Sequence, residues 1–391
     1  MFQTNDIPLS LYIHLPWCAK KCPYCDFNSH LLRDHHQFED YTGALISQLR
    51  GWSELFKSRK IKTVYFGGGT PNLFPIDFIK ILFREIRSIM DIEENSEISF
   101  EVNPLNMFRD SSIEEYFLDL NGLGVNRISV GAQSFDNMSL KRIGREHTPK
   151  EIELFLMDVC KIFKNVNVDL MYGLPGQNQM KVRKDIGTLK DFNVAHISYY
   201  QLTVEPGTMF YNNAPKLPSE DVIWDMYLLI MNELARNGYS RYEVSAFSKG
   251  GMRCQHNMNY WEFGDYIGLG AGAHSKITKN HLIERRIVIS NPVSYVNKIK
   301  SNEQFFKKTS YLPGAEVLFE YMLNAGRLTK GFKILNLEER TGVEFASEQR
   351  KFCLACDKGL IEITSDKVIP TKLGLDFLNN LQEIFLPIKD D

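Results

Sequence analysis

Six short apolar segments, each followed by a stretch with helical periodicity, constrain the fold of this chain more than any other feature. The segments are rich in β-branched and aromatic residues and end in glycine, proline or polar residues, which is typical of strands. They lie at residues 9–15, 61–69, 97–104, 125–134, 166–176 and 195–207. Between them apolar residues recur three and four positions apart, most clearly in residues 38–56. Such a succession predicts an α/β fold with a parallel sheet, either open and doubly wound or a partial barrel.

The carboxyl ends of parallel strands meet at one edge of a sheet, where ligand sites form. The distinctive residues of this sequence fall at these ends. They are the cysteines after the first strand, Gly67 to Gly69 after the second, Glu101 at the end of the third, Gln133 after the fourth and Asp169 at the end of the fifth. One polar strand end is ordinary, but five in succession predict a shared site.

Three of the seven cysteines lie within eight positions, as Cys18, Cys22 and Cys25 in "CAKKCPYC". A cubane iron–sulfur cluster held by three thiolates keeps one iron without a protein ligand, open to a small molecule. Zinc is the competing metal; a structural zinc site needs a fourth ligand, and His14 and His30 are candidates by spacing. The odd number and close spacing of the cysteines favour metal or redox use in a reducing compartment over disulfides.

The composition excludes several classes of function. A formal charge of −2 and a pI near 6.5 predict no overall basic field for nucleic acid. The first residues lack the basic start and continuous apolar core of a signal peptide. No window approaches the roughly 18 apolar residues of a membrane-spanning helix. The chain is therefore expected to be cytoplasmic.

At its motifs the sequence resembles the radical S-adenosylmethionine (SAM) enzymes. "CAKKCPYC" is similar to their cluster motif, and "GGGTPN" at 67–72 to their glycine-rich loop. Within that superfamily, "YIHLPWC" at 12–18, "HNMNYW" at 256–261 and "GLGAGAHS" at 268–275 resemble one branch. This branch contains oxygen-independent coproporphyrinogen III dehydrogenase and its paralogue, the HemW family of heme chaperones. The resemblance covers nearly the whole chain.

The resemblance implies a set of cofactor contacts. Cys18, Cys22 and Cys25 would hold a 4Fe-4S cluster whose open iron is chelated by the methionine moiety of SAM, and electron transfer would release a 5′-deoxyadenosyl radical. The residues implied to contact SAM are Tyr12, Tyr24, Gly67, Gly68, Gly69, Thr70, Glu101, Gln133, Arg145 and Asp169. Carboxylates suit the sulfonium and ammonium groups of SAM, and arginine suits its carboxylate. Glycines let the cofactor approach the backbone.

Two departures separate this chain from the dehydrogenase. The dehydrogenase has a fourth cysteine two residues after the third, where this chain has Phe27, and it carries a longer extension than the 17 residues before Cys18. The expected function is therefore that of a chaperone that binds heme, a 4Fe-4S cluster and SAM and delivers heme to client proteins, expected to be respiratory. Oxidative decarboxylation of coproporphyrinogen III is the alternative. A zinc-bound structural or regulatory protein with a winged helix is a third hypothesis.

A heme carrier needs an axial ligand and flat apolar contacts for the porphyrin. His256 in "HNMNYW" is the predicted ligand, with Tyr260 and Trp261 as the aromatic faces. Cys254 is a second candidate ligand. The competing interpretation is that the His–Asn pair closes a turn of the sheet. On the first interpretation, His256→Ala weakens heme binding and leaves the cluster spectrum intact.

The C-terminal region is predicted to be a winged-helix module. Helical periodicity dominates from about Leu312, followed by a two-stranded wing around residues 360–371 and a last helix from Lys372. Residues 301–391 hold 12 Lys and Arg against 14 Asp and Glu, so a lid or a partner-docking role is expected rather than nucleic-acid binding. Cys353 and Cys356 form a CxxC in a helical pattern and are expected to be buried small residues.

The predicted fold class is α/β, a partial (β/α)6 radical SAM barrel with an α+β extension and a C-terminal winged-helix-like domain. The expected parts are the barrel with the cluster and SAM site at 1–210, an α/β extension carrying the HNxxYW motif at 211–305, and the winged-helix-like domain at 306–391. The expected partners are heme, heme-accepting client proteins and an electron donor for the cluster. Peripheral membrane association and a homodimer are left open, and no nucleic acid is expected.

Overall fold

Six parallel strands form the centre of the molecule and follow one another in space in chain order. The computed structural model describes residues 7–57, 59–104, 113–280 and 282–387. The central strands are β1 (Leu9–Leu15), β4 (Ile61–Gly68), β5 (Ile92–Val102), β6 (Arg127–Gln133), β7 (Asn165–Tyr172) and β8 (His196–Gln201). Each overlaps one of the six predicted segments, which confirms the partial (β/α)6 architecture.

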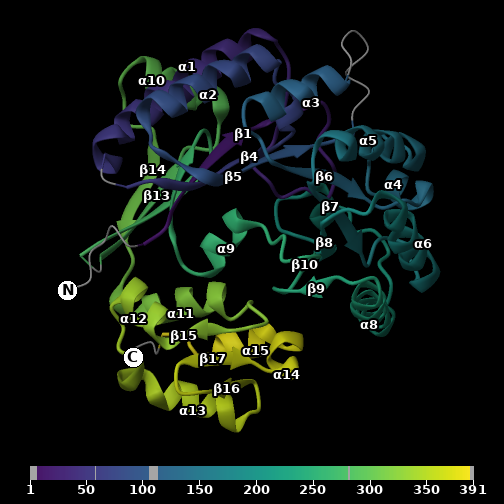
Figure 1. Ribbon diagram of the computed structural model, residues 1–391, viewed down its shortest axis with the longest axis vertical. Helices are drawn as coiled ribbons and strands as arrows, with labels where there is room; N and C mark the ends of the chain where they lie inside the picture. The colour runs from purple at the N-terminus through teal and green to yellow at the C-terminus, as the bar shows by residue number, and fades with distance from the viewer. Residues whose placement is uncertain (1–6, 58, 105–112, 281, 388–391) are drawn as a thin grey trace.

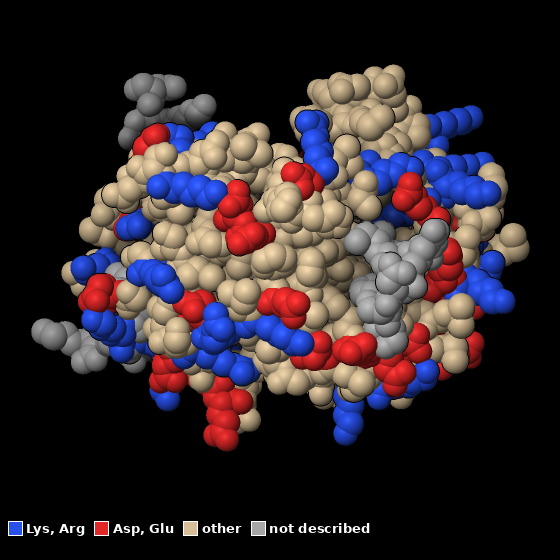
Figure 2. Space-filling view, turned by 90° about the horizontal axis from the view of Figure 1, so that it is seen from above, with Lys and Arg blue, Asp and Glu red and all other residues tan. Residues whose placement is uncertain are grey.

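Helices connect the central strands and cover the outer face of the sheet (Figure 1). They are α1 (His36–Phe56), α2 (Ile76–Ile89), α3 (Ile113–Gly122), α4 (Asn137–Arg142), α5 (Pro149–Ile162) and α6 (Gln179–Leu189), with short 3-10 helices at Pro71–Leu73 and Lys190–Phe192. On the face seen in Figure 2, lysines and arginines are interspersed with aspartates and glutamates.

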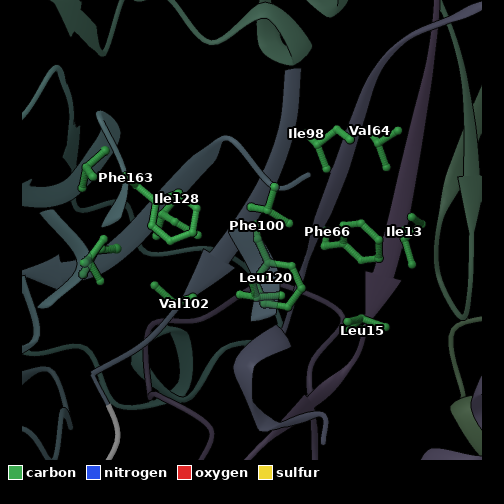
Figure 3. Packing of buried hydrophobic residues seen from close by; sticks show 14 of the residues in the cluster. Ile13, Leu15, Val64, Phe66, Ile98, Phe100, Val102, Leu120, Ile128 and Phe163 are labelled. Atoms are coloured by element: carbon green, nitrogen blue, oxygen red, sulfur yellow. The ribbon is translucent and has the colours of Figure 1, made fainter. Parts of the chain in front are cut away.

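Over most of their length the central strands alternate between an apolar outer face and a polar inner face, as a period of two requires. The outward residues pack beneath the helices in the main core (Figure 3), which includes Ile13 and Leu15 of β1, Val64 and Phe66 of β4, and Ile98, Phe100 and Val102 of β5. The intervening residues point inward and are mostly polar, for example Tyr12, His14, Tyr65, Glu101 and Ser129. The inside of the barrel is therefore where polar chemistry collects.

Further strands extend both edges into a twelve-stranded sheet. Beside β1 lie β11 (Asp265–Leu269), β12 (His274–Lys279), β13 (Leu282–Val288) and β14 (Phe306–Tyr311); beyond β8 lie β10 (Ala246–Ser248) and β9 (Ser240–Arg241). β11 runs parallel to β1, and β12 to β14 are antiparallel. This part of the chain also contains α7 (Met209–Asn212), α8 (Glu220–Arg236), α9 (Gln255–Trp261) and α10 (Pro292–Lys300).

The C-terminal residues form a second hydrophobic core of their own, which Phe263 and Ile283 join from the main part of the chain. Its elements are α11 (Gly314–Ala325), β15 (Phe332–Lys333), α12 (Ile334–Thr341), a 3-10 helix (Phe345–Glu348), α13 (Gln349–Asp357), β16 (Ile361–Ile363), β17 (Lys367–Pro370), α14 (Lys372–Asp376) and α15 (Leu378–Glu383). The antiparallel pair of β16 and β17 is the expected wing, and the expected last helix is interrupted at Phe377.

The burial of Cys353 and Cys356 and the length of the helices test two further expectations. Cys353 is exposed on α13, and Cys356 is only half-buried, so the prediction that both are buried small residues was wrong for Cys353. Within the described ranges, no helix is both long and apolar enough to cross a membrane.

Candidate functional site

The three cysteines lie on the loop between β1 and α1. A short parallel pairing of β2 (Trp17–Cys18) with β3 (His30–Leu31) closes this loop at its base. Cys18 is the last residue of β2 and is buried, while Cys22 and Cys25 are half-buried. Burial raises the pKa of the Cys18 thiol, and negative charge on the other two cysteines raises it further, because all three lie near one another. The loop thus presents three thiols together at the carboxyl end of β1.

The two histidines considered as a fourth zinc ligand have other partners. Both ring nitrogens of His14 are engaged, Nδ1 with the Tyr12 hydroxyl at 2.9 Å and Nε2 with the Asn28 carbonyl at 2.8 Å. His30 Nε2 lies 3.1 Å from Asn28 Oδ1. In the part of the chain that the structure describes, no three or more His, Cys, Asp and Glu side chains are grouped to hold a single metal ion.

The glycine-rich loop after β4 packs directly against the cysteine loop. A Cβ at Gly69 would lie 2.7 Å from the Pro16 carbonyl oxygen, and one at Gly68 would lie 2.8 Å from the His14 ring. Gly68 also has φ +123°, a conformation that side chains disfavour. The glycines are therefore required at least for contact between the two loops, quite apart from any ligand.

Two carboxylates project from the strands into the barrel, and no arginine or lysine among the described residues is bonded to either of them. Glu101 accepts hydrogen bonds from the Tyr65 hydroxyl at 2.8 Å and the Gly68 N–H at 3.1 Å. Burial raises the pKa of Glu101 to about 7. Asp169 accepts from Ser129 at 3.0 Å and Asn167 at 2.8 Å, and burial raises its pKa too. Both carboxylates would gain from a positively charged ligand.

A chain of hydrogen bonds joins the cysteine loop to residues that follow β4, β5 and α4. Thr70 Oγ1 donates to Cys18 Sγ at 3.5 Å and accepts from Asn103 Nδ2 at 3.1 Å. Arg145 donates to Asn103 Oδ1 at 2.9 Å and to the Tyr24 hydroxyl at 3.1 Å. The sequence reasoning missed Asn103, although it lies two residues after Glu101 and therefore on the same face of the strand.

Gln133 ends β6 in a left-handed conformation with φ 69°, where the pairing with β7 changes register. Its amide lies close to Asn103, because a Cβ at Gly131 would meet Asn103 Oδ1 at 2.6 Å and Gln133 Nε2 at 3.2 Å. Unfavourable backbone conformations of this kind concentrate at ligand sites.

A cavity of about 460 Å³ is lined by residues at the carboxyl ends of β1, β4 and β5 and by residues of α9, β11 and β12. Tyr12, Gly68 and Glu101 line it at one end, and the predicted porphyrin contacts Tyr260 and Trp261 line it farther along. Phe27 also lines it and is 60% exposed. The cavity therefore connects three of the predicted SAM residues with an aromatic surface, whereas the other predicted SAM residues do not line it.

His256 does not line this cavity, and its surroundings do not fit the predicted role of axial ligand. Its ring is buried with Nδ1 2.8 Å from Thr63 Oγ1 and Nε2 2.9 Å from the Tyr260 hydroxyl, so neither nitrogen is left for iron. Burial lowers the pKa of His256 to about 3. These contacts favour the interpretation in which the His–Asn pair is structural. Cys254 is fully buried as well, and burial raises its pKa to about 12.

Comparison with known proteins gives close relatives over almost the whole chain. Residues 12–189 match the model of the radical SAM superfamily. The chain is 39% identical to "Heme chaperone HemW" of Buchnera aphidicola subsp. Schizaphis graminum, with 97% of this chain and 98% of that protein covered. The protein of the same name from Haemophilus influenzae is 37% identical, with 97% and 98% covered. The one from Escherichia coli is 36% identical, again with 97% and 98% covered.

Among solved structures, the radical SAM enzyme coproporphyrinogen III oxidase (HemN) from Escherichia coli has a similar fold. The TM-score is 0.82, and the match covers 97% of this chain and 90% of that chain at 21% sequence identity. The likeness concerns the barrel and also the segments that follow it.

Proposed function

The chain belongs to the radical SAM superfamily and, within it, to the HemW family of heme chaperones, and from this membership we propose that it binds heme, a 4Fe-4S cluster and SAM and delivers heme to client proteins. The observation that carries the proposal is the near-complete match, 36–39% identity over 97% of the chain, to proteins named as heme chaperones. We propose respiratory proteins as the clients and the cytoplasm as the place of action.

The donor set of the cysteine loop fits the cluster. We assign Cys18, Cys22 and Cys25 as its ligands, because three neighbouring thiols on one loop hold three irons and leave the fourth open. Cys18 is buried beside the Gly67–Gly69 loop, and Cys22 and Cys25 are half-buried and so remain accessible to a cluster. When bound, a reduced cluster supplies the electron for reductive cleavage of SAM.

The strand-end residues supply the polar contacts that we propose for SAM. Glu101 and Asp169 would face its positive groups, since each carboxylate keeps acceptor capacity beyond its present hydrogen bonds. Arg145 uses Nε and Nη1 within the protein and has a further N–H group for the SAM carboxylate. Tyr12, Tyr24, Thr70 and Gln133 complete the proposed set.

Phe27 argues against the alternative of coproporphyrinogen III decarboxylation. It occupies the position of the dehydrogenase's fourth cysteine with a side chain that is 60% exposed at the cavity. A thiol there can exchange protons or electrons with a substrate, whereas a phenyl ring offers only apolar contact. We therefore propose that the cavity binds a tetrapyrrole without decarboxylating it.

Anaerobic reconstitution of the full-length chain tests the function. We expect about four irons and four sulfides per chain, stoichiometric binding of ferric hemin, and its transfer to apomyoglobin as a probe acceptor. We expect no CO₂ from coproporphyrinogen III in the presence of SAM and reductant. Release of CO₂ would favour the dehydrogenase, and failure to bind hemin would overturn the chaperone proposal.

A further inference from the structure

The turn that follows β6 starts at Gln133, one of the residues proposed to contact SAM. Gln133 has φ 69°, and the pairing of β6 with β7 changes register beside it. A residue other than glycine keeps such a left-handed conformation when the surrounding structure holds it there. The contacts of the next two residues, Ser134 and Phe135, therefore determine where the Gln133 side chain lies.

Asp185 of α6 supplies these contacts. Its side chain is fully buried and accepts hydrogen bonds from the Phe135 N–H at 2.6 Å and from the Ser134 hydroxyl at 3.1 Å. The Ser134 hydroxyl oxygen in turn accepts from the Asp136 N–H at 3.1 Å. The three residues after Gln133 are thus tied to one carboxylate, which lies 50 positions beyond Phe135 in the chain.

A second residue of α6 fastens the same turn. Lys181 lies four positions before Asp185 and pairs with Asp136 at 2.9 Å. Asp136 also caps α4, because its carboxylate accepts from the Ser139 N–H at 2.8 Å. Residues four apart in a helix lie on one face. The face of α6 that carries Lys181 and Asp185 therefore holds the turn at two points, and Asp185 is the one nearer to Gln133 in the chain.

The burial of Asp185 is costly for a residue that only supports the fold. Desolvation raises the pKa of Asp185 to about 7, although the hydrogen bonds from Phe135 and Ser134 lower it in part. Within the described ranges, no arginine or lysine forms an ion pair with this carboxylate. A buried carboxyl group of this kind costs stability, and such groups concentrate at functional sites. The other buried residues of α6 are apolar, namely Val182, Ile186 and Leu189.

Resting on the proposed function, we infer that Asp185 is a positioning residue for SAM, which acts by holding Gln133 in its left-handed conformation. Asp185 lies on a helix that covers the outer face of the sheet, so it acts through the turn and does not touch the cofactor itself (Figure 1). Without its carboxylate, the buried donors of Phe135 and Ser134 would need other partners, and the turn would move with them.

Calorimetric titration of SAM into the reconstituted full-length protein, without reductant, tests the inference. Asp185→Ala should weaken SAM binding about tenfold, because the turn loses its acceptor, while cluster iron stays at about four atoms per chain. Asp185→Asn keeps one acceptor oxygen, and its affinity should lie between those of Asp185→Ala and the unchanged protein. Val182→Ala, which removes buried apolar volume from the same helix, is the matched control. It should lower the free energy of unfolding and leave SAM affinity within about twofold.

A double-mutant cycle distinguishes positioning of Gln133 from general support of the fold. Gln133→Ala should itself weaken SAM binding, because it removes the side chain that Asp185 positions. In the Gln133→Ala background, Asp185→Ala should reduce SAM affinity by less than about twofold further. Two full and independent losses in the double variant would overturn the inference, and so would equal losses of affinity in Asp185→Ala and Val182→Ala.

The remaining outcomes separate this inference from the function on which it rests. Failure of the unchanged protein to bind SAM would overturn the proposed function and the inference together. If the unchanged protein binds SAM, but a folded Asp185→Ala or Asp185→Asn protein binds it within about twofold as tightly, the inference alone is overturned. Unaltered SAM affinity in Gln133→Ala would also overturn the inference and leave the function in place.

Discussion

The two ends of the barrel both contain buried charges and distinctive sequence motifs, yet they differ in how those charges are satisfied. At the amino end, the buried carboxylate of Asp265 pairs with Arg59 at 2.9 Å and with Lys276 at 3.0 Å. At the carboxyl end, Glu101 faces a cavity and, among the described residues, accepts hydrogen bonds from the Tyr65 hydroxyl and the Gly68 N–H.

The difference shows at which end the buried carboxylate already has cationic partners and at which end a ligand could supply one. A buried carboxylate with cationic partners is already balanced, and removal of a partner is expected to affect stability. A buried carboxylate without a cation has a raised pKa, as Glu101 does at about 7, and a positively charged ligand relieves the cost. The amino end is thus structural and the carboxyl end is built for cofactors.

The largest expected effect is loss of the cluster when the carboxyl end loses a thiol. Cys22→Ser should reduce cluster iron from about four atoms per chain to near zero, because two thiolates do not retain the cubane. Iron analysis and the visible spectrum after anaerobic reconstitution measure this. Cys254→Ser is the matched control from the amino end, where the thiol donates to Glu97 at 3.6 Å, and it should keep its iron. Equal iron loss in both variants would contradict the comparison.

A large loss of stability is expected when the amino end loses a charge. Asp265→Ala leaves Arg59 and Lys276 buried without their counter-charge, which should lower the free energy of unfolding by about 3–5 kcal/mol. Urea unfolding measures it. Asp119→Ala, which removes a partner of Lys80 at 2.8 Å on the surface, should cost less than about 1 kcal/mol. Similar costs for the two variants would show that the network around Asp265 is not a structural requirement.

Glu101 should couple SAM binding and stability to pH. The folded pKa near 7 lies above the unfolded value of 4.5, so the ligand-free protein should lose stability as pH rises through this window. Glu101→Gln should remove that loss, worth up to about 3 kcal/mol at pH 8, and thereby stabilise the ligand-free protein there.

The affinity for SAM should rise with pH over the range in which the stability of the ligand-free protein falls. Because ionised Glu101 suits a cationic ligand, the unchanged protein should bind SAM more tightly as pH rises through about 7. Calorimetric titration between pH 6 and 8 should show this trend, and Glu101→Gln should bind SAM more weakly with a flatter profile. An unaltered profile in the variant would exclude Glu101 from SAM binding.

Sequence reasoning succeeded where the information is local. Short apolar runs rich in β-branched and aromatic residues identified all six central strands, and the spacing of Cys18, Cys22 and Cys25 identified the loop that presents three thiols. It could not find the partners of His256, because Thr63 lies 193 positions away in the chain.

The break between α14 and α15 at Phe377 was not predicted, since helical periodicity continues across it. Asn103 was missed for a different reason. Its link to Thr70 and Arg145 needs two other strands to bring those side chains within 3.1 Å and 2.9 Å. Contacts across a sheet follow from topology, which short motifs do not specify.

The most direct test of the contrast between the two ends is a pair of measurements on one variant, His256→Ala, with urea unfolding and hemin titration on the same protein. Loss of the bonds to Thr63 and Tyr260 should lower the free energy of unfolding by about 1–3 kcal/mol, while the Soret band and hemin affinity stay unchanged. Unchanged stability together with a lost Soret band would place the heme iron at His256 and contradict this account.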